Sequence, residues 1–130
     1  MDEPVWLIPE VLLALHRAHL AEHGGAEGLR DAGLFESALA RPQNRWSYAS
    51  DVSPFQLAAA YGYGLAKNHA FVDGNKRTAL VSMLLFLELN GYKLAASQEQ
   101  RYEAVLREAS GDMEEGQLAE WLSAHAVAIS

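Results

Sequence analysis

Residues 78–89 read TALVSMLLFLEL and form the longest apolar stretch of the chain. Ser82 and Glu88 interrupt the stretch, which falls short of the ~18 apolar residues that a helix needs to cross a bilayer. Apolar side chains lie on every side of the helix that residues 80–89 would form. The stretch therefore predicts a buried core helix surrounded by other helices, and we expect no membrane partner.

Helix start and stop signals flank this stretch. Asn75 begins the apolar helix, and Gly91 ends it as a left-handed cap. Upstream, Ser53 with Gln56 three residues later has the capping-box pattern of a helix that runs to about residue 68. The chain between the two helices, residues 69–74, is then a loop.

The N-terminal part of the chain predicts two further helices. Pro9 suits the first turn of a helix that stops at Gly24. A short helix over residues 34–41 ends at Pro42. We expect the polar and aromatic residues 43–48 to form a loop.

Two more start signals predict two helices after residue 91. They are Ser97 with Gln100, and Asp112 with Glu115. Residues 92–94 are the one segment that we expect to be extended, and no alternation of period two lasts long enough for a larger sheet. The last helix carries these residues on one face: Leu118, Trp121, Leu122, His125 and Ile129.

Together these signals predict an all-α fold, a single compact domain over residues 1–130 with about six helices around a buried central helix. Half of the 130 residues are hydrophobic, which is enough for one core. The chain has no cysteine, so a disulfide scaffold, a cysteine-ligated zinc site and a thiol nucleophile are excluded.

The charge balance bears on partners and location. Ten basic and 17 acidic residues give a net charge of −7. This negative charge opposes a phosphate backbone, so we expect no direct nucleic-acid binding. The first residues are acidic and lack a secretory signal pattern, which predicts a cytoplasmic protein.

Residues 69–77, HAFVDGNKR, concentrate the reactive side chains of the chain. Gly74 before Asn75 leaves the first N–H groups of a helix free to bind an anion. Lys76 and Arg77 in that first turn oppose the helix dipole by about 0.3–1 kcal/mol, unless an anion sits between them and the backbone. The motif therefore predicts a phosphate site, although each residue taken singly equally suits a turn, a cap or a solvated cation.

Two side chains of the motif have the chemistry to act on a bound phosphate. Asp73 offers a hard oxygen ligand for the Mg²⁺ that accompanies phosphates. His69 can accept a proton from an attacking hydroxyl. We expect Phe71, between them, to point into the core.

These nine residues resemble the H-x-F-x-D-G-N-K-R signature of the Fic/Doc superfamily, specifically its Doc branch of death-on-curing toxins. Residues 24–31, 36–43 and 86–92 are also similar to Doc-type sequence, so the resemblance covers nearly the whole chain. It implies the toxin of a type II toxin–antitoxin pair, with His69 as general base and Asp73 as Mg²⁺ ligand. It also implies a cradle for the ATP phosphates that consists of Gly74, Asn75, Lys76 and Arg77. Lys76 and Arg77 also belong to the implied catalytic set, together with His69 and Asp73.

Two departures from the wider Fic pattern bear on the reaction. Fic adenylyltransferases have a glycine in place of Lys76 and an arginine in place of Leu80. A lysine there would crowd the α- and β-phosphates, so the nucleotide should sit differently. Doc-type members are understood to bind ATP reversed and to transfer its γ-phosphoryl group to a threonine of elongation factor Tu, which arrests translation.

We therefore expect an ATP-dependent protein kinase, with elongation factor Tu as the target that the resemblance implies. Two alternatives stay open: a protein adenylyltransferase, and a catalytically silent module that binds an antitoxin and tunes operon repression. The resemblance also implies a small antitoxin whose disordered tail folds on binding. Self-inhibition by the Ser/Thr-x-x-x-Glu-Gly motif of some Fic proteins is unsupported, because Gly111 stands where the hydroxyl residue should be.

Four histidines lie outside the motif. His16, His19 and His23 share one predicted helix, and the last two have the spacing of a zinc site. Since no third ligand is evident, we expect surface histidines. His125 should be a hydrogen-bonded structural residue.

Two pairs of residues have open roles. Trp46 and Tyr48 suit either a flap that holds a target peptide or a lid over the core. Arg30 and Asp31 pair either with each other or with the 69–74 loop.

Overall fold

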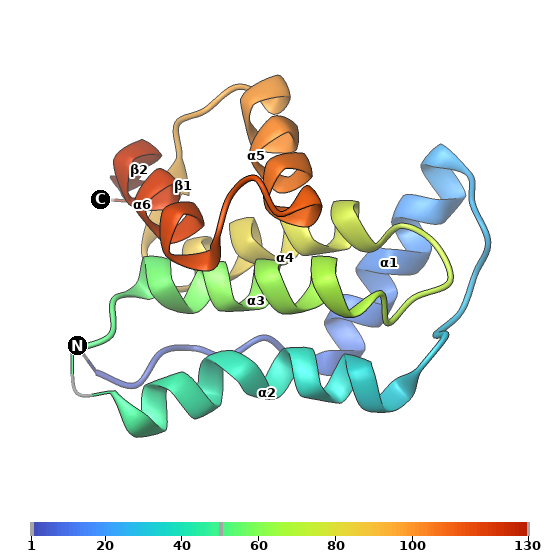
Figure 1. Ribbon diagram of the computed structural model, residues 1–130, viewed down its shortest axis with the longest axis horizontal. Helices are drawn as coiled ribbons and strands as arrows, with labels where there is room; N and C mark the ends of the chain where they lie inside the picture. The colour runs from blue at the N-terminus through green and yellow to red at the C-terminus, as the bar shows by residue number, and fades with distance from the viewer. Residues whose placement is uncertain (1, 50, 130) are drawn as a thin grey trace.

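The computed structural model describes residues 2–49 and 51–129. Over these ranges the chain forms six helices and two short strands (Figure 1). The order is α1 Pro9–His23, α2 Ala32–Tyr48, α3 Pro54–Asn68, α4 Asn75–Leu89, β1 Tyr92–Leu94, α5 Gln98–Ser110, α6 Glu115–His125 and β2 Ala126–Ala128. The predicted all-α fold is confirmed. None of the described helices is both long enough and apolar enough to span a membrane.

Helix α3 is the buried central helix. Figure 1 shows α2 along one side of it, α5 and α6 along the other, and α4 behind. Nine of its 15 residues are buried. The apolar stretch that suggested a central helix belongs to α4, which packs against α1, α3 and α5 but leaves Leu80 and Leu84 half-buried and Leu89 46% exposed.

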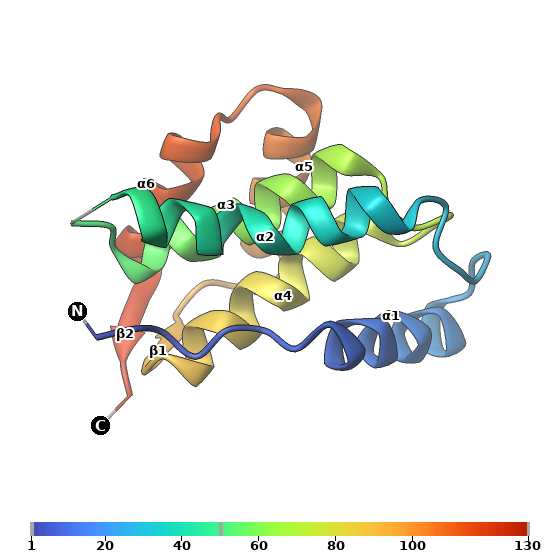
Figure 2. The same cartoon turned by 90° about the horizontal axis from the view of Figure 1, so that it is seen from below.

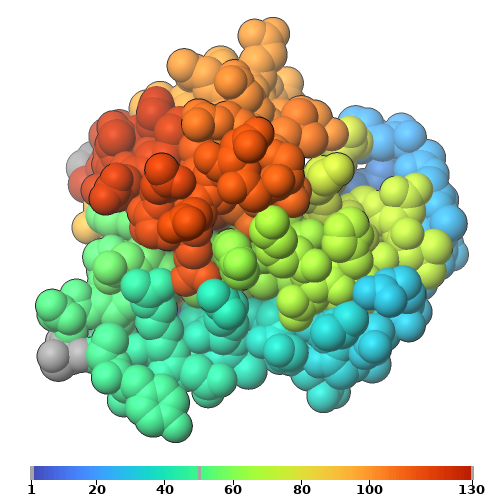
Figure 3. Space-filling view, viewed as in Figure 1, coloured from blue at the N-terminus to red at the C-terminus, as the bar shows by residue number. Residues whose placement is uncertain are grey.

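Small residues explain why α3 can lie at the centre. Gly62 faces α4, where an added Cβ would overlap the side chain of Met83. Gly64 faces α2, where an added Cβ would lie 3.2 Å from the Cα of Ala38. Because neither glycine has a side chain, two helices approach the α3 backbone closely. Figure 3 shows the C-terminal segments packed against α3, part of which stays visible beside them.

Helix α2 is longer than predicted, because Pro42 lies inside it and does not end it. A proline removes one backbone hydrogen bond, but Pro42 is buried beside Ala38 and Leu39, and this packing offsets the loss. The predicted 43–48 loop is therefore wrong.

The flap interpretation of residues 43–48 is also wrong, because their backbone is helical. Trp46 is half-buried and packs against the core, as a lid residue would. Tyr48 is 91% exposed.

The N-terminal segment sets the place of α1. Residues 2–8 run extended along the molecule to the start of α1 (Figure 2). The Val5 N–H donates to Asn90 Oδ1 at 2.8 Å, and Asn90 Nδ2 donates to the Val5 carbonyl at 3.1 Å. The Leu7 N–H donates to the Tyr61 hydroxyl oxygen at 3.2 Å. These bonds direct α1 onto α4.

The capping boxes predicted at Ser53 and Ser97 are both present. Helix α6 instead begins after Glu114, whose N–H donates to Gln117 Oε1 at 2.8 Å, so the start at Asp112 is wrong.

Two short strands close the C-terminal end of the fold. The predicted extended segment is β1, and it pairs antiparallel with β2, which the sequence did not indicate. Ile129 follows β2 and donates its N–H to the Gly91 carbonyl at 2.9 Å, so it does not lie on the last helix as predicted.

Helix α5 carries a buried carboxyl group, that of Glu108. Glu108 is 1% exposed, and among the described residues its Oε1 has no hydrogen-bond partner. Burial raises the pKa of Glu108 to about 7, although the nearby Lys67 charge acts in the opposite direction. The folded state therefore keeps this proton near neutral pH.

We expect a Glu108→Gln variant to change how stability depends on pH. Between pH 4.5, the ordinary pKa of the carboxyl, and about 7, the unfolded chain has lost the proton that the folded chain retains. The free energy of unfolding should thus fall with rising pH across this window, by up to about 3 kcal/mol at 1.36 kcal/mol per pKa unit. Urea unfolding at pH 5 and pH 8 should show a smaller fall in the variant than in the wild type. An equal fall in both would contradict the prediction, and the exposed Glu120→Gln serves as control.

Candidate functional site

The 69–74 loop joins α3 to α4 at the end of the molecule where α1 also ends (Figure 1). His69 ends α3 in the left-handed conformation, with φ 50°. Gly74 precedes α4, also left-handed, with φ 77°. A non-glycine residue with positive φ persists where its surroundings impose it, which is common at functional sites. The side chains of His69 and Asp73 are exposed.

Arg30 holds the loop from one side. Its Nε donates to the His69 carbonyl at 2.7 Å, and its Nη2 donates to the Asn68 carbonyl at 3.1 Å. The backbone N–H groups of Arg30 and Asp31 both donate to the Ala70 carbonyl. Of the two pairings left open, Arg30 thus binds the loop, while the Asp31 side chain caps α2 by accepting from the Leu34 N–H at 2.9 Å.

Asn75 holds the loop from within. Its Oδ1 accepts from the Phe71 N–H and its Nδ2 donates to the Phe71 carbonyl, both at 3.0 Å. Asn75 is 8% exposed, and Phe71 is buried as predicted. The Asn75 side chain therefore serves the loop, which leaves its backbone N–H as the group that is available to an anion.

His16 on α1 holds the loop from a third side, contrary to the predicted surface position. It is 2% exposed, and its Nε2 lies 2.7 Å from the Asp73 carbonyl oxygen. Leu12, His16 and Leu20 are the buried residues of α1 and recur every four positions. This spacing was the signal in the sequence that placed His16 on the inner face.

The start of α4 is open to an anion. Over the described residues no side chain caps this helix, whereas Asp31, Ser53 and Ser97 each cap theirs. The first helical bond of α4 runs from the Thr78 N–H to the Gly74 carbonyl. The N–H groups of residues 75–77 precede this bond and remain available, together with the positive end of the helix dipole.

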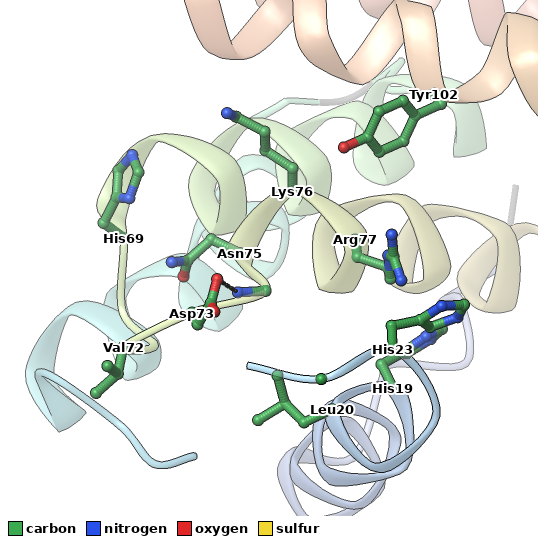
Figure 4. Close-up of a pocket in the computed structure, with 12 residues that line it drawn as sticks. His19, Leu20, His23, His69, Val72, Asp73, Asn75, Lys76, Arg77 and Tyr102 are labelled. Atoms are coloured by element: carbon green, nitrogen blue, oxygen red, sulfur yellow. Dashed lines mark hydrogen bonds between the residues drawn. The ribbon is translucent and has the colours of Figure 1, made fainter. Parts of the chain in front are cut away.

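A hollow of about 430 Å³ lies over this helix start (Figure 4). Figure 4 shows His69 and Lys76 on one side of it and Arg77, His19 and His23 on the other. All six site residues predicted from the sequence line the hollow: His69, Asp73, Gly74, Asn75, Lys76 and Arg77.

Other lining residues were not predicted. Tyr102 reaches the hollow from α5, and no pattern in the sequence indicated this. His19 and His23 reach it from α1. Burial, with a smaller contribution from the Arg77 charge, lowers the pKa of His19, so this ring faces the hollow as a neutral imidazole.

Asp73 suits a magnesium ion held jointly with phosphates. Its Oδ1 accepts from the Gly74 N–H at 2.8 Å. Its Oδ2 faces Gly25, where an added Cβ would lie 2.7 Å away, so only a glycine leaves this oxygen its space. No three His, Asp or Glu residues of the described chain are grouped to hold a metal ion. A single carboxylate with phosphates and water is the usual Mg²⁺ arrangement.

Comparison with known proteins identifies the family of the chain. The Fic/DOC family model matches residues 6–87, which include the loop and the start of α4. The chain belongs to the Fic/DOC family. "Protein kinase doc" of Escherichia phage P1 is 43% identical over 91 residues, which cover 70% of this chain and 72% of that protein. "Toxin Doc" of Mycolicibacterium smegmatis is 49% identical over 75 residues, which cover 56% of this chain and 57% of that protein. The resemblance to the Doc branch of the Fic/DOC family is thereby confirmed.

We expect Asn75→Ala to destabilise the protein by about 2 kcal/mol, because it leaves the buried N–H and carbonyl of Phe71 without partners. Urea unfolding measures the loss. Asn75→Asp, which keeps the acceptor but removes the donor, should also destabilise. Unchanged stability with weakened phosphate binding would instead mean that the side chain serves the ligand.

Proposed function

We propose that this chain is the toxin of a toxin–antitoxin pair and that it transfers the γ-phosphoryl group of ATP to a protein hydroxyl. By resemblance that hydroxyl belongs to a threonine of elongation factor Tu. The observation that carries the proposal is the gathering of His69, Asp73 and the uncapped start of α4 around one hollow. Membership of the Fic/DOC family and the two Doc relatives support it.

The residues of the hollow divide the work of phosphoryl transfer. The N–H groups of residues 75–77 and the guanidinium of Arg77 bind the phosphate oxygens, and Lys76 adds a second positive charge. Asp73 would hold Mg²⁺, which neutralises phosphate charge when bound. His69 accepts the proton of the target hydroxyl as its oxygen bonds to the γ-phosphorus and the bond to the β-phosphate oxygen breaks, releasing ADP.

The 24–31 segment is suited to hold the target beside His69. The Val72 N–H donates to the Gly28 carbonyl at 3.0 Å, and Leu29 pairs with Phe71 in an antiparallel bridge. All residues of the segment are exposed. A target peptide can therefore add to the backbone edge of this segment that does not face the loop. We place here the peptide-holding role that the sequence suggested for residues 43–48.

An apolar groove of about 680 Å³ next to the hollow suits the antitoxin. Leu80, Val81, Leu84 and Leu106 contribute its apolar side chains, from α4 and α5. It shares four lining residues with the hollow: His19, His23, Arg77 and Tyr102. An amphipathic antitoxin helix in the groove would reach the nucleotide and block it.

We expect His69→Ala and Asp73→Ala each to lower γ-phosphate transfer at least 10²-fold while leaving the fold intact, because both side chains are exposed. Incubation of the purified protein and target with γ-labelled and then α-labelled ATP measures the reaction. Label from the α-phosphate would instead establish nucleotidyl transfer. Growth arrest by His69→Ala without any labelling would favour the silent binding module.

Leu84→Asp should weaken neutralisation by the co-expressed antitoxin, because it places a charge in the apolar groove. Growth arrest should return in cells that express both proteins, and γ-phosphate transfer by the free variant should persist. Full neutralisation of the variant would place the antitoxin elsewhere. The exposed Glu120→Ala on α6 is the control.

A further inference from the structure

We propose that His16 is a positioning residue that sets the orientation of the peptide unit between Asp73 and Gly74. Through this unit it aims the Asp73 carboxylate and the start of α4 at the bound phosphates. The part of the proposal that concerns catalysis rests on the function proposed above. The part that concerns the peptide unit stands on the contacts alone.

His16 donates a hydrogen bond to the Asp73 carbonyl oxygen. A carbonyl oxygen can only accept, so the His16 Nε2 at 2.7 Å from the Asp73 oxygen must carry a proton and donate it. The neutral Nε2–H tautomer and the imidazolium ion both satisfy this requirement. The bond therefore does not depend on the charge of the ring.

Packing against Phe71 fixes the orientation of the His16 ring. His16 stacks on Phe71 with ring centroids 3.8 Å apart and planes 17° apart. Phe71 in turn meets the edge of Phe35 at 5.4 Å. All three side chains are buried. The donor thus has a defined direction before any ligand arrives.

The hydrogen bond from the His16 ring also affects the orientation of the Asp73 carboxylate. The Asp73 carbonyl and the Gly74 N–H belong to one planar peptide unit, so holding the oxygen also orients the N–H. That N–H donates to Asp73 Oδ1 at 2.8 Å. This bond fixes the orientation of the Asp73 carboxylate, which is the group that would hold a metal ion. Rotation of this peptide unit would break the bond from the Gly74 N–H to Asp73 Oδ1 and would change the direction of the first N–H groups of α4.

His16 binds a part of the loop that Arg30 and Asn75 do not contact. Arg30 binds the carbonyls of Asn68 and His69, and Asn75 binds Phe71. Neither contacts the Asp73 carbonyl, which within the described residues is held from α1. An added Cβ on Gly74 would lie 3.5 Å from the His16 ring, so the ring also packs against the helix start.

His125 offers a matched control. Its Nδ1 lies 2.8 Å from the Trp121 carbonyl, and its ring lies 4.4 Å from the Trp121 ring. Like His16 it combines a hydrogen bond to a backbone carbonyl with an aromatic contact, but it is half-buried, bonds within its own helix α6 and lies away from the hollow. Loss of its hydrogen bond can affect stability but should not affect the 73–74 peptide unit.

The test compares His16→Leu, His16→Gln and His125→Leu. Leucine keeps an apolar side chain in line with Leu12 and Leu20, and glutamine restores an N–H donor near the Nε2 position. In the protein without nucleotide, we expect the Gly74 amide to exchange with D₂O at least tenfold faster in His16→Leu. It should be slowed again in His16→Gln and unchanged in His125→Leu. An unchanged Gly74 amide in folded His16→Leu would overturn the proposal.

The kinetics of γ-phosphate transfer by the same variants test whether His16 also affects catalysis. His16→Leu should lower kcat about tenfold and raise the Mg²⁺ concentration needed for half-maximal γ-phosphate transfer, with partial rescue in His16→Gln. Equal losses in His16→Leu and His125→Leu would reduce His16 to a structural residue and overturn this part. A wild-type protein that transfers no phosphate would refute the proposed function alone, because the amide measurement needs no nucleotide.

Discussion

The site depends on hydrogen bonds that hold the backbone of one loop. Two residues that are far away in the sequence and one that directly follows the loop bind peptide groups of residues 68–75. They are Arg30 from the segment before α2, His16 from α1 and Asn75 from the start of α4. Because the backbone is held from inside and outside, His69 and Asp73 can stay exposed and still keep a defined place. Such a loop is organised before a ligand binds, which reduces the ordering that binding would otherwise require.

The rest of the fold supplies the frame for these three contacts. Glycines of α3 let α2 and α4 approach it closely. The loop between α3 and α4 therefore connects two closely packed helices. The N-terminal segment, bound to Asn90 and Tyr61, brings α1 against α4 and His16 under the loop. Packing of the central helices and the position of the side chains around the hollow are thus linked through α1.

Much of the fold could be predicted because its signals are local. The capping boxes at Ser53 and Ser97 depend on residues three apart in the chain, and both are present. Predictions failed where packing between distant elements outweighed a local rule. Pro42 lies inside α2 because its burial against the core compensates for a missing bond, and β2 forms because β1 is there to pair with it.

The sequence alone identified six of the residues that surround the hollow, since these six come from nine consecutive positions and contiguity forces them together. Only the tertiary structure decided what holds them. Arg30 and His16 precede the loop by dozens of residues, and a hydrogen bond between such positions leaves no periodic trace in a single sequence. The physical reason is that backbone carbonyls carry no residue identity, so the partner of a buried imidazole becomes visible only when the chain is folded.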